Sequence, residues 1–233
     1  MGCGLSEKES MQVIPAMISG KTKEHLCQLS TNCLLHKAVL SPFLALQEAA
    51  AVQGYDLQVA SAFRSFERQL MIWNAKALGE WPVLDEYGKP LNLENLCEKD
   101  KVFAILRWSA LPGCSRHHWG TDMDIWDAAA VPQDYVLQLT PDEYQQGGPF
   151  HSLSCWLDEY AEVFGFVRPY EIDRGGVAPE PWHLSYSPVA RVFEAKLDAQ
   201  CIYKILDNSD LILRDTILTH LDEIISRFIF TGT

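Results

Sequence analysis

The segment Cys114–Trp126, which reads C-S-R-H-H-W-G-T-D-M-D-I-W, constrains the fold more than any other stretch of the chain. Gly120 and the alternation of aspartate with apolar residues after it indicate a turn followed by a strand. Side chains alternate along a strand, so Asp122 and Asp124 would point to the same face. We therefore expect a strand over 121–126 that carries its two carboxylates on one side.

Helical and extended patterns follow one another irregularly along the rest of the chain. Pro42 opens and Gly54 closes the first helical pattern, and Ser65 is placed to cap the second. The patterns predict helices over 42–53, 66–78, 101–110, 150–164, 188–198 and 210–229, strands over 55–63, 121–126, 166–167 and 181–186, and long loops over 81–100 and 128–149. Residues 1–41 are expected to be irregular or weakly helical. This order predicts an α+β fold, with a small antiparallel β-sheet flanked by helices.

The chain is acidic and of moderate length. It has 233 residues and a net charge of −12, and we expect residues 1–233 to form a single domain. A negative chain has no general attraction to nucleic acid or to anionic membranes, so neither is an expected partner. No apolar run approaches the roughly 18 residues that a membrane span needs.

The cysteines and the first residues bear on the compartment. Seven cysteines, an odd number without a C-x-x-C pair, are typical of reduced thiols rather than of a disulfide framework. The start of the chain, M-G-C-G-L-S-E-K-E-S-M-Q, lacks the charged and apolar regions of a signal peptide. Gly2 and Ser6 match an N-myristoylation pattern only loosely. These features indicate a cytoplasmic protein.

A second polar segment, Glu180–His183, reads E-P-W-H. Together with His117 and Asp124 it offers two imidazoles and two carboxylates, which is the donor set of a catalytic zinc site with a base beside it. In an extended segment its first and last residues would point to opposite sides, so a bend at Pro181 is needed to bring both to one metal. Each motif taken alone is more often a polar loop or a core histidine, and His118 competes with His117 as a ligand.

Three segments resemble a known family of metallopeptidases. Ser115–Asp124 resembles the S-x-H-x-x-G-x-A-x-D motif of the LAS metallopeptidases, which are named for lysostaphin, the D-Ala-D-Ala metallopeptidases and sonic hedgehog. Glu180–His183 resembles their second motif, E-x-W-H. Ser61–Gln69, S-A-F-R-S-F-E-R-Q, resembles the S-x-[YF]-R-S-x-x-x-Q segment of VanY-type D-Ala-D-Ala carboxypeptidases. The resemblance implies a hedgehog/D-Ala-D-Ala peptidase-like fold over a core of residues 40–186. The helical patterns that follow predict a helical extension over 187–233.

The resemblance also implies a role for each matching position. His117, Asp124 and His183 would bind one zinc ion per chain. Glu180 would act as general base and then as general acid, and Arg64 would stabilise the developing oxyanion. The residues implied in contacts with the substrate are Ser61, Ser65, Gln69, Ser115 and Trp182.

Asp122 is the position at which this chain departs from the family pattern, which usually has alanine there. On the strand face shared with Asp124, its carboxylate would support the zinc site by accepting a hydrogen bond from a ligand histidine. The alternative is that it only pairs with Arg116. The sequence leaves both readings open.

The resemblance implies a zinc-dependent carboxypeptidase that releases the terminal D-alanine from peptidoglycan stem peptides or muropeptides. The expected compartment favours muropeptide recycling, and with it LD cleavage of tetrapeptides slightly over DD cleavage of pentapeptides. Two enzyme alternatives are an endolysin-type peptidoglycan endopeptidase and a D-Ala-D-Ala dipeptidase. A zinc-stabilised, hedgehog-like binding module is the alternative without activity; it would be expected to lack the base or the arginine, whereas Glu180 and Arg64 are both present.

Overall fold

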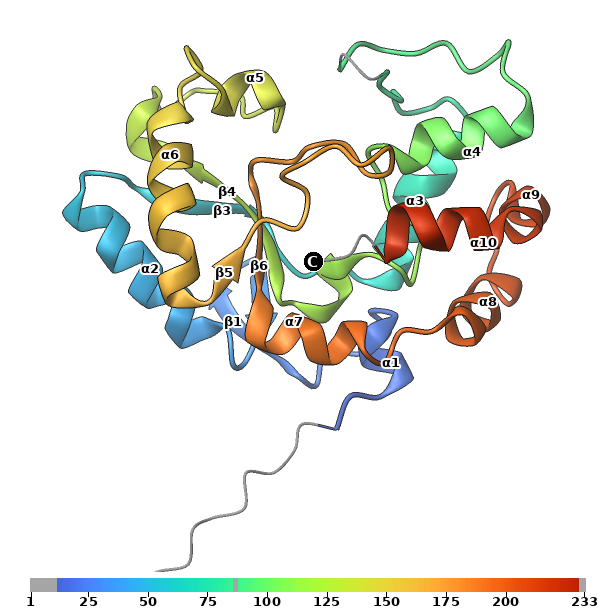
Figure 1. Ribbon diagram of the computed structural model, residues 1–233, viewed down its shortest axis with the longest axis horizontal. Helices are drawn as coiled ribbons and strands as arrows, with labels where there is room; N and C mark the ends of the chain where they lie inside the picture. Colours follow the sequence, from blue (N-terminus) through green and yellow to red (C-terminus); the bar gives the residue numbers. More distant parts are fainter. Residues whose placement is uncertain (1–11, 86–87, 231–233) are drawn as a thin grey trace, which may run out of the picture.

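A four-stranded antiparallel sheet lies at the centre of the molecule in the computed structural model, which describes residues 12–85 and 88–230 (Figure 1). The strands follow the order β3 (Leu57–Ser61), β4 (Asp122–Asp127), β6 (His183–Tyr186) and β5 (Phe166–Val167). The small antiparallel sheet and the helices around it confirm the predicted α+β class. The myristoylation pattern at Gly2 and Ser6 lies outside the described residues.

One face of the sheet is apolar and is covered by two helices, α2 (Leu40–Val52) and α6 (His151–Tyr160), which lie side by side on the left of Figure 1. Met123, Ile125 and Leu184 point into this core and are fully buried. Because side chains alternate along a strand, the residues between them point to the opposite face. Asp122 and Asp124 of β4 and His183 and Ser185 of β6 therefore lie on the side away from α2 and α6.

The helices on the other side share a second hydrophobic core. It is formed by α3 (Phe66–Ala77), α4 (Glu98–Leu106), α7 (Ser187–Glu194), α8 (Ala199–Asp207), α9 (Arg214–Thr219), α10 (Leu221–Ile224) and the π-helical turn Ile225–Ile229. Trp73 of α3 is fully buried there, and its Nε1 donates a hydrogen bond to the carbonyl of Ile212 at 3.0 Å. Along the described ranges, no helix is long and apolar enough to cross a membrane.

Helix boundaries differ from the predicted ones mainly near the C-terminus. The segment predicted as one helix over 210–229 is divided into α9, α10 and the π-helical turn. The sequence pattern does not predict helix α8, because it places the end of the preceding helix at Asp198. In the structure, the Asp198 side chain accepts a hydrogen bond from Cys201 N and caps α8. The predicted loop over 128–149 contains the short helix α5 (Pro141–Tyr144) and a 3-10 turn, Ala128–Ala130.

The N-terminal region contains a β-hairpin, so the expectation of an irregular or weakly helical segment is wrong for residues 26–36. After the short helix α1 (Pro15–Ile18), strands β1 (Leu26–Ser30) and β2 (Cys33–His36) pair in antiparallel register. A shift in that register between Gln28 and Ser30 interrupts the alternation by which a strand is recognised in sequence.

This hairpin supports the turn before β4. The 3-10 helix Arg116–Trp119 ends at Gly120, whose φ of 68° lies in the left-handed region that favours glycine. A Cβ at this position would lie 2.5 Å from Leu26 Cδ2 and 2.8 Å from the backbone nitrogen of His36. That nitrogen donates to the Gly120 carbonyl at 2.8 Å. Glycine is therefore required where the chain turns from His117 into the strand that carries Asp124.

The loop over 168–182, between β5 and β6, is held by residues from two distant helical regions. Arg107, directly after α4, donates a hydrogen bond to the carbonyl of Gly176 at 2.8 Å. Arg227, in the π-helical turn, donates from Nε and Nη2 to the carbonyl of Gly175 at 3.1 and 2.7 Å. The C-terminal helices thus contact the loop that carries Glu180.

Candidate functional site

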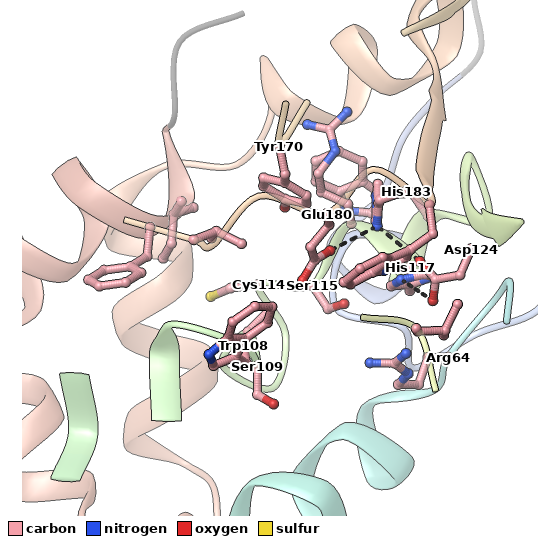
Figure 2. Close-up of a pocket in the computed structure, with 18 of the residues that line it drawn as sticks. Arg64, Trp108, Ser109, Cys114, Ser115, His117, Asp124, Tyr170, Glu180 and His183 are labelled. Atoms are coloured by element: carbon pink, nitrogen blue, oxygen red, sulfur yellow. Dashed lines mark ion pairs between the residues drawn. The ribbon is translucent and has the colours of Figure 1, made fainter. Parts of the chain in front are cut away.

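Strand register brings three sequence motifs to one line across the sheet. Asp124 on the central strand β4 is the pairing partner of Ser61 on β3 and of His183 on β6. His117 approaches from the 3-10 helix before β4. One donor atom from each of His117, Asp124 and His183 lies within 4.8 Å of the others, and all three residues are buried (Figure 2). The structure therefore assembles the predicted metal ligands at one point.

One ring nitrogen of each histidine faces away from the predicted metal site, and a hydrogen bond to that nitrogen orients the ring. His117 Nδ1 lies 2.9 Å from the carbonyl of Ala62, which can only accept, so Nδ1 carries the proton and Nε2 is available as a donor atom toward a metal. That Nε2 lies 3.5 Å from Asp124 Oδ2. Burial, reinforced by the charges of Arg64 and His183, lowers the pKa of His117 to about 3. The ring is therefore neutral, as metal binding requires.

His183 is held from its other side. Its Nε2 lies 2.9 Å from Asp122 Oδ1, and its Nδ1 lies 3.3 Å from Asp124 Oδ1. Burial opposes a charge on this ring, but the hydrogen bond to Asp122 and the two carboxylate charges outweigh it and raise the pKa of His183 to about 9. A divalent cation at Nδ1 would take the place of that proton.

Two buried atoms at this point, His183 Nδ1 and Asp124 Oδ1, lie 3.3 Å apart but make no well-aligned hydrogen bond with each other or with any other described residue. Buried polar atoms are nearly always satisfied, since an unpaired one costs about 1–3 kcal/mol. A nitrogen and an oxygen acceptor left open beside His117 Nε2 form a donor set that suits zinc. The residues present therefore fit a metal ion.

Asp122 lies at the centre of a buried network and contacts both Arg116 and His183, so it does not pair with Arg116 alone. Its Oδ1 accepts from Arg116 Nε at 2.7 Å and also contacts His183. Arg116 in turn donates to Ser185 Oγ at 2.7 Å and to Glu194. These contacts hold the pKa of Asp122 well below its usual range despite complete burial. Asp122 is thus an ionised group that fixes the orientation of a predicted ligand.

The E-P-W-H segment turns as the sequence requires. His183 N donates to the Glu180 carbonyl at 3.0 Å, which closes a tight turn over Pro181. Glu180 Oε2 then lies 3.5 Å from His183 Nδ1, on the same side as the predicted ligands. Burial raises the pKa of Glu180 to about 7. A carboxyl group with such a pKa can accept and return a proton near neutral pH.

Arg64 lies close to the same centre. Its backbone nitrogen donates to the His117 carbonyl at 3.1 Å, which connects the arginine segment to the ligand loop. Its guanidinium donates to Gln69 Oε1 at 2.9 Å and to Ser61 Oγ at 3.3 Å. Burial lowers the pKa of Arg64, and the negative charges of Asp124 and Glu180 oppose this change. Arg64 is therefore a fixed cation beside the predicted base.

These residues open onto a cavity of about 260 Å³. Ser115 and Trp182, both predicted to contact substrate, line it. Ser61 and Ser65 instead line a separate depression on the other side of Arg64. The Ser65 side chain accepts from Arg68 N and caps α3.

Gln69 and His118 hold their surroundings in place. Gln69 is fully buried, and its Nε2 donates to the Ala110 carbonyl at 2.7 Å, so it fixes Arg64 rather than reaching the cavity. Both nitrogens of His118 are engaged: Nδ1 lies 2.6 Å from the Arg64 carbonyl, and Nε2 accepts from Gly113 N at 2.9 Å. His118 therefore has no nitrogen left for a metal.

Several cavity residues were not identified from the sequence. They come from α3, from the segment after α4, from the loop over 168–182 and from the C-terminal helices: Lys76, Trp108, Ser109, Tyr170, Val177, Phe228 and Phe230. The Tyr170 ring packs against the His183 ring with centroids 4.9 Å apart. None of these residues belongs to a recognisable motif, so only the tertiary structure reveals them.

Sequence comparison identifies relatives of known family. A family model described as VanY, D-alanyl-D-alanine carboxypeptidase, matches residues 32–189. An uncharacterized protein of Haemophilus influenzae is 49% identical over 105 residues, which cover 43% of this chain and 72% of that protein. A D-alanyl-D-alanine carboxypeptidase of Enterococcus faecalis is 27% identical over 172 residues, which cover 72% of this chain and 54% of that protein.

Solved structures with the same fold agree. A mutant of the vancomycin resistance D,D-pentapeptidase VanY, in complex with Zn(II), superposes with a TM-score of 0.52 at 25% identity over 74% of this chain and 85% of that chain. VanYB in complex with D-alanine-D-alanine superposes with a TM-score of 0.51 at 22% identity, over 79% of this chain and 89% of that chain. The family match spans all four strands of the central sheet and the whole predicted site. The chain therefore belongs to the VanY family of D-alanyl-D-alanine carboxypeptidases, which are peptide hydrolases.

Proposed function

We propose that this protein is a zinc-dependent carboxypeptidase that releases the terminal D-alanine from peptidoglycan stem peptides. One observation carries the proposal: His117, Asp124 and His183 converge at one point beside Glu180, and two of their buried atoms find no hydrogen-bond partner in the part of the chain that the structure describes. The superposition on a VanY mutant in complex with Zn(II) supports the choice of metal.

The side chains divide the reaction between them. Zinc held by the two histidines and Asp124 would polarise the scissile carbonyl and make a water molecule more acidic. Glu180 takes the proton from the attacking water and passes it to the departing amine, which its pKa of about 7 permits in both directions. Arg64 stabilises the negative charge that develops on the carbonyl oxygen.

Supporting contacts keep these groups in place during the reaction. Asp122 holds the His183 ring from behind, and Gln69 holds the Arg64 guanidinium. Catalysis gains from such fixed polar groups, because they need no rearrangement as charge develops. A binding module that uses zinc only for stability would not need a base and an arginine held in place beside the metal, whereas a hydrolase does.

Within this class, we propose the tetrapeptide of recycled muropeptides as the first substrate to test and the pentapeptide as the second. The preference rests on the compartment expected from the composition. Cleavage inside a crosslinked stem would point to the endopeptidase alternative. Release of D-alanine only from free D-Ala-D-Ala would point to the dipeptidase.

The test is an incubation of the purified full chain with tetrapeptide and pentapeptide muropeptides, analysed by mass spectrometry. We expect loss of one alanine from one of them, abolished by a chelator and restored by added zinc. Which substrate is shortened decides between the LD and DD reactions. Intact substrates after incubation with zinc-loaded protein would rule the carboxypeptidase out.

A further inference from the structure

The cavity contains a cation that the family motifs do not include. Lys76 lies near the end of α3 and lines the cavity together with Arg64 and Glu180. Its Nζ donates a hydrogen bond to Ser109 Oγ at 2.6 Å. Within the described ranges, Lys76 forms no ion pair with a carboxylate. An ammonium group has three donors, so an anion could be bound alongside the serine.

The other two cations of the cavity wall are already engaged. Arg116 directs its three nitrogens to Asp122, Glu194 and Ser185. Arg64 bonds to two neutral side chains and faces the charges of the catalytic centre. Lys76, by contrast, has one side-chain hydrogen bond among the described residues, to a neutral serine, and it interacts with Glu180 through charge without an ion-pair contact.

A carboxypeptidase needs such a charge close to its catalytic centre. The carboxylate of the released residue lies one residue beyond the scissile bond, and consecutive Cα atoms are about 3.8 Å apart. Burying that carboxylate without a partner would be costly. The side chain that recognises this carboxylate must therefore line the same cavity as the base. Lys76 lines that cavity, whereas the predicted substrate-binding residues Ser61, Ser65 and Gln69 do not.

We propose that Lys76, positioned by Ser109, binds the terminal carboxylate of the residue that is released. This inference rests on the proposed function. It identifies Lys76 as the residue that restricts cleavage to peptides with a free C-terminal carboxylate. Burial, together with the nearby Arg64, lowers the pKa of Lys76 to about 8, so the ammonium form still prevails at neutral pH. A bound carboxylate would stabilise that form further.

The first test compares two substrates that differ only at the end of the chain. One is the stem peptide that the enzyme cleaves, and the other is the same peptide with a C-terminal amide. We expect the wild type to prefer the acid, and Lys76→Met to lower kcat/KM for the acid roughly ten- to hundredfold while the amide changes little. An unchanged preference in Lys76→Met would overturn the assignment.

A second measurement makes the result independent of turnover. Binding of N-acetyl-D-alanyl-D-alanine and of its amide is measured by calorimetry in the zinc-loaded Glu180→Gln background, with lysine or methionine at position 76. We expect the acid to bind roughly tenfold tighter or more only when lysine is present. If the wild type releases no D-alanine, the proposed function fails, while this comparison still decides whether Lys76 recognises carboxylates. Equal binding of acid and amide with lysine present would refute that role.

Matched variants separate charge from packing. Lys76→Gln keeps a donor for Ser109 without the charge and should lose the acid preference like methionine, which covers the case in which Lys76→Met does not fold. Lys76→Arg keeps the charge and should retain most of the preference. Lys196→Met, at an exposed lysine of the segment after α7, should behave as wild type. A loss of preference in Lys76→Arg as large as in Lys76→Gln would contradict recognition by charge.

Discussion

The cavity has a strand-borne wall and a helix-borne wall, and the two hold their polar groups very differently. On the strand-borne wall, Asp124 and His183 are paired across β4 and β6, and His117 lies in the 3-10 helix directly before β4. Hydrogen bonds from behind hold both histidines. The helix-borne wall consists of Lys76, Trp108, Ser109, Phe228 and Phe230, which come from segments far apart in the sequence. It is largely apolar and carries a single cation.

We expect this difference to separate two tasks, with catalysis on the strand-borne wall and the choice of substrate on the helix-borne wall. The strand-borne wall lies within the region that the family model matches, as do Lys76, Trp108 and Ser109, whereas Phe228 and Phe230 lie beyond it. Fixed donors and acceptors serve a reaction that all members of a family share, because their geometry tolerates little change. Apolar contacts and one charge on helices can vary without disturbing that geometry. We therefore expect changes on the strand-borne wall to affect turnover and metal binding, and changes on the helix-borne wall to affect KM.

The largest effect is expected from Glu180→Gln, which removes the proposed base and keeps the shape of the side chain. Turnover should fall by a factor on the order of 10²–10⁴, the usual contribution of general acid–base catalysis. Zinc content, measured by elemental analysis of the purified variant, should stay at the wild-type level.

Glu171→Gln is the matched control, because Glu171 is an exposed glutamate of the same loop. It should leave both turnover and zinc content unchanged. Full activity of Glu180→Gln would show that another group acts as the base.

An intermediate effect is expected from Asp122→Asn. The hydrogen bond to His183 Nε2 would lose its charge, and partners of ligand histidines typically contribute roughly 10–100-fold to metal affinity. Competition with a zinc-binding dye should report a loss of this size.

Glu194→Gln tests the network without touching the histidine, since Glu194 contacts Arg116 but not His183. Its zinc affinity should remain close to that of the wild type. If both variants bind zinc equally well, the orientation of His183 does not depend on Asp122.

The smallest effect is expected on the helix-borne wall, from Phe230→Ala. Phe230 lines the cavity but is 43% exposed, so only part of its surface is available to a substrate. We expect KM to rise roughly threefold to tenfold, consistent with the loss of about 1 kcal/mol of apolar contact, with kcat unchanged. Steady-state kinetics on the cleaved stem peptide measures both constants.

Tyr203→Ala removes an aromatic ring of similar exposure from α8, away from the cavity, and should leave KM unchanged. A fall in kcat rather than a rise in KM for Phe230→Ala would break the division of labour between the two walls.

The strand-borne wall could be predicted from the sequence because its residues belong to short motifs that together resemble those of a known family. The alternation around Asp124 and the turn before His183 are properties of a few neighbouring residues. The hydrogen bond between Asp122 and His183 is different, since it depends on the register of strands that are 61 positions apart at these residues. The sequence offered that bond only as one of two alternatives.

The helix-borne wall could not be predicted for the same physical reason. Lys76 reads as an ordinary polar residue near the end of a helix, and its place in the cavity follows only from how α3 packs. Helix α8 and the hairpin β1–β2 were missed because a new cap at Asp198 and an interrupted alternation at Gln28 replace the usual signals. In each case tertiary packing decided what the local pattern left open.

The pairing of Asp124 with His183 also bears on folding errors. Moving β6 by one residue against β4 would exchange the faces of His183 and Leu184, so a polar imidazole ring would enter the apolar core under α2 and α6. The buried ionic partners of the ring would then be left unpaired, at a cost of several kcal/mol, comparable to the whole stability of a small domain. Chains with a shifted sheet would thus be unstable rather than weakly active. For this protein, the fraction of molecules that fold should equal the fraction that carry a correctly built site.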